Sequence, residues 1–324
     1  MRISNEHADP KRYGRGVTGL IVSVPTEQLA ADVRARLSPA DDIEVVIWAD
    51  GDAPRDDIDI VVPPYMKQGR MLRALQAIKP RLIQGQAIGY DGVADVLPEG
   101  FVYANASSVH ETATAEITLG LLIAAQRGFA DFVRHQDQSD WFYNKTPGLA
   151  DSRVLMLGYG GVGKAIAARL DPFEVELIPV ASRAREEDGR QVRSIDGFRE
   201  LLPQTDILIN VLPGGPETRH LIDDAVLSEL PDNALVVNVG RGPTVDTDAL
   251  VDHVRRGRIR VASDVFDPEP LPADHPLWSL PGVIITPHVG GLTNAMAPRI
   301  AKLVAEQAQR LARGEDPINV VIGG

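Results

Sequence analysis

Short apolar runs alternate with longer amphipathic segments along most of this 324-residue chain. Runs of four to six apolar residues suit buried strands, whereas apolar positions three and four residues apart are typical of helices. Because helical segments separate most of the runs, the pattern predicts parallel sheets covered by helices. In the first part of the chain we expect strands at residues 19–24, 43–48, 58–62 and 82–85, and helices at 26–37, with Thr26 as N-cap, and at 70–78.

The second part of the chain continues this alternation. We expect strands at residues 154–157, 176–180, 207–212, 234–239, 261–265 and 283–286, and helices at 195–202, 223–230 and 247–256. Six strands in this order complete a doubly wound domain. The last helix, at residues 297–314, is therefore expected to return to the first domain. This divides the chain into a discontinuous domain, residues 1–104 plus 292–324, and a second domain, residues 105–291.

A strongly helical segment at residues 111–127 leads into an irregular one at 135–148. The irregular segment holds Trp141, Phe142 and Tyr143, and a simple linker would not need these aromatic side chains. It is expected to be an arm that covers a domain or a second subunit. Packing of the same side chains within their own domain is an equally good interpretation.

Three glycines follow the apolar run 154–157 at the spacing G-x-G-x-x-G, and a helical pattern begins at once after them. Gly158 permits a tight turn, Gly160 lets the backbone approach a pyrophosphate, and Gly163 lets the helix pack closely on the strand. The free N–H groups at the start of the helix would face the phosphates. The turn, which also contains Tyr159, Gly161 and Val162, therefore predicts dinucleotide binding in the second domain.

Composition narrows the class of protein. A formal charge of −12 argues against a nucleic-acid surface, which usually needs a basic face. The chain has no cysteine, which excludes disulfides, thiolate catalysis and zinc-thiolate sites, and we expect no metal site. Residues 1–16 lack the apolar core of a signal peptide, and no run reaches the length of a membrane helix. A cytoplasmic enzyme without a membrane partner is the simplest interpretation.

Three strand ends in the second domain carry residue types suited to reduction of a 2-keto acid. Arg241 follows one buried strand, and a guanidinium there can hold a carboxylate or polarise a carbonyl. Glu269 lies in a proline-rich loop after the next strand, and His288 follows the last one. Because ligands gather at the carboxyl ends of doubly wound sheets, these side chains are expected to share a site. Glu269 beside His288 would favour the charged imidazole that donates a proton to a carbonyl oxygen.

These motifs together resemble those of the D-isomer-specific 2-hydroxyacid dehydrogenase family. The resemblance covers roughly residues 86–321 and rests on four motifs in the family's order, at residues 158–163, 238–242, 264–270 and 286–291. It implies an α/β fold of two doubly wound parallel-sheet domains, a flavodoxin-like substrate domain and a Rossmann nucleotide-binding domain. It also implies Arg241 as substrate-binding residue, Glu269 as partner of the histidine, His288 as acid and base, and homodimers built on the nucleotide domain.

Further roles follow from the same resemblance. The loop containing Ile88 and Gly89 looks like the family loop whose backbone N–H groups hold the substrate carboxylate. Asp264 matches the acidic residue that contacts the nicotinamide carboxamide, and Leu212 and Pro213 belong to a loop that contacts the cofactor. This sequence departs from the family at Gly215, where relatives often carry threonine.

The choice of cofactor depends on the residues about 20 positions beyond the glycine turn, where an acid would bind the ribose 2′-hydroxyl of NAD. Here the chain has Ser182 and Arg183, with no acid before Glu186. A serine and an arginine can bind a 2′-phosphate, which a carboxylate would repel. NADP is therefore predicted over NAD. The alternative is that Arg183 and Arg185 are solvated and that NAD binds.

The resulting hypothesis is hydride transfer from NADPH to C2 of a small 2-keto acid, with glyoxylate or hydroxypyruvate as leading substrates. An NAD-linked enzyme for phosphoglycerate, lactate or a bulkier 2-hydroxy acid is one alternative. A phosphorylated substrate would need cations near Gly89, and the nearby ones in sequence are Lys67, Arg70 and Arg73. A non-catalytic, nucleotide-sensing protein of the corepressor type is the other alternative. Residues that could shape the pocket, although each suits ordinary packing, are Trp48, Tyr65, Met66, Tyr90 and His110.

Overall fold

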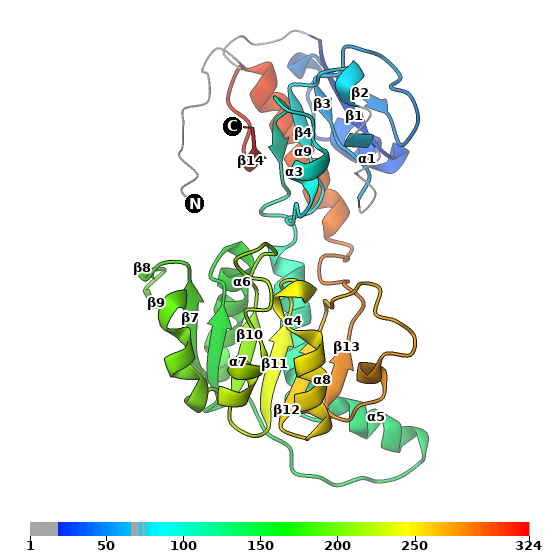
Figure 1. Cartoon of the computed structure of the whole chain (residues 1–324). Helices are drawn as coiled ribbons and strands as arrows, with labels where there is room; N and C mark the ends of the chain where they lie inside the picture. Colours follow the sequence, from blue (N-terminus) through cyan, green and yellow to red (C-terminus); the bar gives the residue numbers. More distant parts are fainter. Residues whose placement is uncertain (1–18, 66–70, 73–74, 324) are drawn as a thin grey trace. The chain divides into compact units, whose positions relative to one another are not determined.

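The computed structural model describes residues 19–65, 71–72 and 75–323 (Figure 1). The chain divides into two compact units, the first formed by residues 1–110 and 294–324 and the second by residues 111–293. The helix expected at 70–78 is described only in part, as helical residues 71–72 and the 3-10 turn η2, Leu75–Ala77. Met66, Lys67, Arg70 and Arg73 lie outside the described residues.

The first unit contains one sheet with the strand order β14-β5-β4-β3-β1-β2. Its five parallel strands follow the flavodoxin-like order 2-1-3-4-5, and β14 joins the edge antiparallel to β5. Thr26 caps the first helix as expected, because its side chain accepts a hydrogen bond from the Leu29 amide. The strands are β1 (Leu20–Val24), β2 (Ile43–Ile47), β3 (Ile60–Val61), β4 (Leu82–Gln84), β5 (Tyr103–Ala104) and β14 (Val320–Ile322); the helices are α1 (Glu27–Arg34), η1 (Pro39–Asp41), α3 (Val93–Val96) and α9 (Met296–Ala312).

Both faces of the first sheet are buried. On one face, Leu20, Val22 and Val24 of β1 pack with Val33 of α1 and Val304 of α9. On the other face, residues of β1, β3 and β4 form a second cluster that includes Trp48, Leu72 and Tyr103. Burial on both faces explains why these strands read as continuous apolar runs in the sequence.

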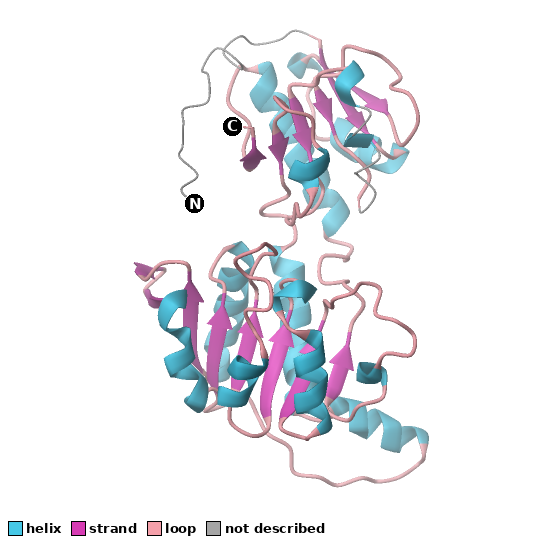
Figure 2. Cartoon of the chain, viewed as in Figure 1, coloured by secondary structure: helices cyan, strands magenta, loops and turns pink. Residues whose placement is uncertain are grey.

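The second unit contains a sheet with the order β13-β12-β11-β10-β6-β7-β9-β8 (Figure 2). The run β9-β7-β6-β10-β11-β12 gives the Rossmann order 3-2-1-4-5-6, and β13 adds one further parallel strand. Only β8, at the other edge, is antiparallel to its neighbour. The two doubly wound sheets confirm the predicted fold class. The strands are β6 (Arg153–Leu157), β7 (Glu176–Ala181), β8 (Arg185–Glu187), β9 (Arg190–Ser194), β10 (Ile207–Asn210), β11 (Ala234–Asn238), β12 (Ile259–Ser263) and β13 (Val283–Ile285).

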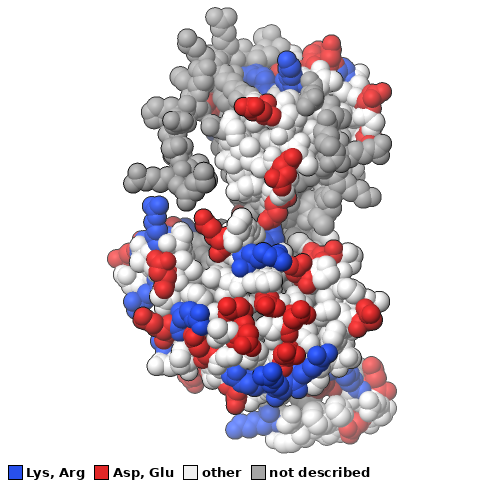
Figure 3. All heavy atoms as spheres, viewed as in Figure 1, with Lys and Arg blue, Asp and Glu red and all other residues white. Residues whose placement is uncertain are grey.

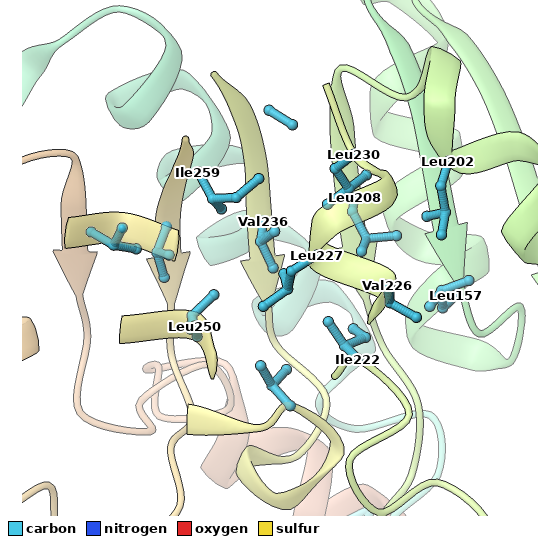
Figure 4. Close-up of a cluster of buried hydrophobic side chains, with 14 of the residues drawn as sticks. Leu157, Leu202, Leu208, Ile222, Val226, Leu227, Leu230, Val236, Leu250 and Ile259 are labelled. Carbon is cyan, nitrogen blue, oxygen red and sulfur yellow. The ribbon is translucent and has the colours of Figure 1, made fainter. Parts of the chain in front are cut away.

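Helices cover both faces of this sheet. On one face α4 and α6 pack on residues such as Val154, Met156 and Ile209. On the other face, Figure 4 shows Leu208 and Val236 of the sheet packed against Val226 and Leu227 of α7. The helices are α4 (Glu111–Gln126), α5 (Phe129–Asp137), α6 (Gly161–Leu170), α7 (Asp224–Glu229) and α8 (Thr247–Arg255), with 3-10 segments η3 (Asp171–Phe173), η4 (Ile195–Gln204), η5 (Gly242–Thr244) and η6 (Pro276–Trp278).

The structure differs from the sequence prediction at two places in the second unit. The β8–β9 hairpin was not expected, because residues 185–194 are mostly charged and only Val192 among them enters the core. The segment 135–148 is not irregular throughout, since α5 extends to Asp137. Trp141 and Tyr143 do not pack within their own unit, because they are 95% and 93% exposed.

The described surface carries mixed charge. On the visible face of the second unit, acidic and basic side chains are interspersed (Figure 3). Within the described part of the chain, no helix is long and apolar enough to cross a membrane.

Candidate active site

The glycine turn between β6 and α6 has the geometry that a bound dinucleotide requires. Gly158 has φ +108°, and a Cβ there would lie 2.9 Å from the carbonyl oxygen of Val211. A Cβ on Gly163 would lie 2.3 Å from the carbonyl oxygen of Gly158, so only glycine lets α6 start this close to the strand. Gly160 caps α6 without a side chain, and no atom of a described residue other than its chain neighbours lies within 4 Å of the position its Cβ would take. Backbone amides at this helix start can therefore meet a pyrophosphate.

Burial decides which of the predicted cofactor-binding residues can present a side chain to a cofactor. Tyr159 is buried among core residues of the second unit, and this burial raises the pKa of its phenol. Any contact of Tyr159 with a cofactor would therefore come from its backbone. Leu212 is buried and Pro213 is exposed in the loop after β10.

Ser182 and Arg183 lie exposed directly after β7, at the carboxyl edge of the sheet. Arg183 forms no ion pair with any described residue. Arg185 instead pairs with Glu187 at 2.6 Å and donates to the carbonyl of Tyr159 at 3.2 Å. Lys164 also pairs with Glu187, at 2.6 Å. Arg183 and Arg185, the two arginines near the expected position of a 2′-phosphate, thus have different surroundings. Among the described residues, a carboxylate neutralises the charge of Arg185 but not that of Arg183.

Asp264 organises the backbone on which His288 sits. The Asp264 carboxylate is 3% exposed, and it accepts hydrogen bonds from the Thr286 hydroxyl and from the amides of Val289 and Gly290. Its backbone carbonyl accepts from the His288 amide at 2.7 Å. Three successive amides, of residues 288–290, therefore converge on one residue, and His288 has a left-handed φ of +53°. Such a turn of amides around an anion is a recurrent backbone arrangement.

His288 and Glu269 form a hydrogen-bonded pair. The distance between His288 Nδ1 and Glu269 Oε2 is 2.7 Å, and Glu269 Oε1 accepts from the Phe266 amide at 2.8 Å. The hydrogen bond to Glu269 raises the pKa of His288, against the opposing effects of partial burial and of the Arg241 charge. Burial opposes ionisation of Glu269, but hydrogen bonds from His288 and Phe266 outweigh it, so its pKa is lowered. The pair therefore favours an imidazolium beside a carboxylate.

Arg241 is held by a buried polar network that the sequence analysis did not identify. Asn210 donates to Asn238 Oδ1 at 2.9 Å and to the Thr244 hydroxyl at 2.5 Å. Asn238 and Thr244 in turn both donate to the Arg241 carbonyl. Asparagine at the end of two otherwise apolar strands was the available signal, because a buried amide needs polar partners.

Glycines bring the three strand-end loops into contact. A Cβ on Gly240 would lie 2.6 Å from the Leu212 carbonyl oxygen, and one on Gly242 would lie 1.8 Å from the Phe266 carbonyl oxygen. The loops after β10, β11 and β12 can therefore approach backbone to backbone. This approach places Arg241 close enough to influence both His288 and Glu269. Ile88 and Gly89 belong to the first unit, half-buried after β4.

The sequence profile of the D-isomer specific 2-hydroxyacid dehydrogenase NAD binding domain matches residues 119–290, more than half of the chain. The chain belongs to the D-isomer specific 2-hydroxyacid dehydrogenase family. This result confirms the resemblance drawn from the four motifs. Members of the family are NAD(P)-dependent oxidoreductases, and the second unit of this dehydrogenase contains the family's Rossmann domain.

Two glyoxylate reductases are among the similar proteins of this dehydrogenase. That of Aeropyrum pernix is 34% identical over 263 residues, which are 76% of this chain and 77% of the relative. That of Pyrococcus horikoshii is 29% identical over 309 residues, which are 87% and 90% of the two chains.

Two solved structures extend the comparison. A D-isomer specific 2-hydroxyacid dehydrogenase from Xanthobacter autotrophicus, in complex with NADPH and MES, matches with a TM-score of 0.79 at 25% identity, over 95% of this chain and 99% of its own. An NADPH-dependent glyoxylate/hydroxypyruvate reductase from Sinorhizobium meliloti, in complex with NADP and malonate, matches with a TM-score of 0.77 at 25% identity, over 94% and 98%.

The pKa of His288 can be tested without any substrate. Glu269→Gln keeps the shape of the side chain but removes the charge that favours the imidazolium, so the pKa of His288 should fall. NMR titration of the imidazole measures this change. Asp140→Asn serves as the control, because it alters the separate His135–Asp140 pair and should leave the His288 titration unchanged. An unchanged His288 pKa in Glu269→Gln would show that the observed hydrogen bond does not control the charge of the imidazole.

Proposed function

We propose that this dehydrogenase reduces a small 2-keto acid of the glyoxylate or hydroxypyruvate type to a D-2-hydroxy acid with NADPH. The observation that carries the proposal is the pairing of His288 with Glu269 beside Arg241, at the carboxyl edge of the sheet that contains the glycine turn. Glyoxylate reductases among the relatives support the substrate class. The cytoplasmic location expected from the sequence stays a prediction.

Each residue of the proposed site has a distinct task. Nicotinamide cofactors supply the hydride that attacks C2 of the keto acid. His288, held charged by Glu269, donates its proton to the carbonyl oxygen, so that C=O becomes CH–OH. Arg241 binds the substrate and offsets negative charge that develops on the oxygen. The amides of the Ile88–Gly89 loop hold the substrate carboxylate, which makes the first unit the substrate-binding domain and the second the NAD(P)-binding domain.

The glycine turn of residues 158–163 and the loop at Leu212 and Pro213 would hold the cofactor, and Asp264 belongs to the same site by family resemblance. The Asp264 carboxylate accepts three hydrogen bonds from its own chain, which fixes the surrounding backbone, and it has one further acceptor site for the nicotinamide carboxamide. The 2′-phosphate of NADP would meet Ser182 and Arg183. NAD remains the second choice of cofactor.

Reduction of 2-keto acids is tested by the loss of absorbance at 340 nm, with glyoxylate, hydroxypyruvate, pyruvate and phenylpyruvate as substrates. We expect fastest turnover of glyoxylate or hydroxypyruvate with NADPH. His288→Asn should lower kcat by about 100- to 10,000-fold, the usual contribution of general acid catalysis, without weakening NADPH binding. His135→Asn, a substitution in another part of the second unit, is the control. Full turnover by His288→Asn would remove His288 from the mechanism, and no turnover of any keto acid by the unaltered enzyme would contradict the proposed function.

Cofactor preference is tested by Arg183→Ala. Loss of a charged hydrogen bond to the 2′-phosphate should lower kcat/KM for NADPH by about 10- to 100-fold and leave that for NADH within about twofold. Arg256→Ala, which removes another exposed guanidinium at the end of α8, should change neither value. Equal effects on the two cofactors, or preference of the unaltered enzyme for NADH, would contradict the assignment of NADP.

A homodimer formed through the second unit is also proposed. Trp141 and Tyr143 are almost fully exposed, and Phe129 and Val133 of the neighbouring α5 are about half exposed. Figure 2 shows the segment after α5 passing along the amino-end side of the strands of this unit, opposite the arrowheads. Exposed aromatic side chains gathered on one segment are typical of interfaces, and a second copy of the chain would bury them.

Light scattering after gel filtration tests the dimer. The unaltered chain should elute as a dimer, and the double substitution Trp141→Asp and Tyr143→Asp should elute as a monomer. Trp278→Asp replaces an exposed tryptophan elsewhere in the same unit and should leave the dimer intact. A monomeric unaltered chain would disprove the proposed assembly.

A further inference from the structure

Four successive backbone carbonyls after β4 are each bound by another group of the first unit. These are the carbonyls of residues 85–88, at the start of the loop that contains Gly89. Three of the donors come from residues 105–110, beyond β5, and one comes from β4 itself. Gly85 accepts from Gln84 Nε2 at 2.8 Å, Gln86 from His110 Nε2 at 2.6 Å, Ala87 from the Ala106 amide at 2.9 Å, and Ile88 from Asn105 Nδ2 at 2.8 Å.

Binding these carbonyls also sets the direction of the amides that follow them. In a trans peptide the C=O of one residue and the N–H of the next lie in one plane and point to opposite sides. Anchoring the carbonyls of residues 85–88 therefore turns the N–H groups of residues 86–89 away from the anchoring groups. None of these four amides donates to another described residue. Oriented amides that donate to no other described residue can receive an anion.

Hydrogen bonds at both ends of its amide group fix the orientation of the Asn105 side chain. It is 5% exposed, and its Oδ1 accepts from the amide of Ser107 at 3.2 Å and from the Ser107 hydroxyl at 2.9 Å. The oxygen must therefore face Ser107, and the amide nitrogen must face the carbonyl of Ile88. Its backbone amide donates to the Asn319 carbonyl at 3.0 Å, which ties the residue to the chain next to β14. Asn105 thus fixes the peptide plane that carries the Gly89 N–H.

We propose that Asn105 is a positioning residue that aims the Gly89 amide at the carboxylate of the substrate. His110 has the corresponding task for the Ala87 amide, through the carbonyl of Gln86. Asn105 does not itself touch the substrate in this proposal. The inference rests on the proposed function, which places the keto acid carboxylate on this loop.

The test is Asn105→Asp. The aspartate oxygen still accepts from Ser107, but an ionised carboxylate cannot donate to the Ile88 carbonyl and repels it, so the peptide plane between Ile88 and Gly89 rotates. KM for the 2-keto acid should rise at least about tenfold, while kcat stays within about threefold and the Kd of NADPH is unchanged. If this variant does not fold, Asn105→Ser removes the donor without adding charge and is measured in its place.

Asn319→Gly is the matched control. It removes the hydrogen bond from Asn319 Nδ2 to the Ser107 carbonyl, in the same polar cluster, but leaves all four anchored carbonyls untouched. Glycine also accepts the left-handed φ of +59° at this position. KM should remain within about twofold of the unaltered enzyme. An equal rise in both variants would show that Asn105 has only a general structural role.

Failure of this inference can be told apart from failure of the proposed function. If the unaltered enzyme reduces a 2-keto acid and Asn105→Asp has the same KM, the positioning role is wrong and the function stands. If the unaltered enzyme reduces no keto acid, the function is wrong, and the loop is tested with the unreactive carboxylate oxamate. Oxamate, added to the NADPH-bound protein, should shift the ¹⁵N-amide signals of Ala87 and Gly89 in the unaltered chain but not in Asn105→Asp; no shift in the unaltered chain would overturn the inference.

Discussion

The buried carboxylate of Asp264 is the constraint on which the candidate active site depends. A carboxylate that is 3% exposed is tolerated only when hydrogen bonds replace its water, and here a hydroxyl and two backbone amides do so. The amides belong to the residues directly after His288. Satisfying the carboxylate therefore also stabilises the left-handed backbone at His288, a conformation that a non-glycine residue rarely adopts. The imidazole reaches Glu269 because this turn holds its backbone in place.

Close packing of strand ends supplies the rest of the arrangement. Gly240 and Gly242 allow neighbouring backbones to approach to distances that a side chain would block. The Asn210–Asn238–Thr244 network binds the carbonyl of Arg241, which lies between these two glycines in the chain. Together these contacts bring a guanidinium, a carboxylate and an imidazole from three loops to one edge of the sheet. The same principle operates in the first unit, where bound carbonyls orient the amides of the loop after β4. In both units, buried polar groups hold the backbone, so that the proposed ligand-binding groups are in position before a ligand binds.

The sequence predicted those features that leave a local signature. Buried parallel strands appear as apolar runs, and the turn at Gly158 has a characteristic glycine spacing, so the glycine turn and most parallel strands of both sheets were predicted from the sequence. The short strands β5 and β14 of the first sheet were not predicted, because runs of two or three residues leave no clear pattern. The β8–β9 hairpin was missed because it lies at the edge of the sheet and its residues are mostly charged. The partners of Asp264, the pairing of Arg185 with Glu187, and the anchors of the Ile88 loop could not be predicted, because each joins residues that are far apart in sequence or depends on the direction of a peptide plane. The roles of Arg241, Glu269 and His288 rest on family resemblance and stay predictions.

The most direct test of this account is the effect of Asp264→Asn on the imidazole of His288. The amide has nearly the same shape as the carboxylate, but in either orientation its NH₂ group must face a backbone N–H, that of Val289 or that of Gly290, so the turn at residues 288–290 should open. We expect circular dichroism to show an intact fold, and NMR titration to show a pKa of His288 lower than in the unaltered chain, because the imidazole has lost its contact with Glu269. A folded Asp264→Asn protein with an unchanged His288 pKa would contradict the central claim that Asp264 organises the site.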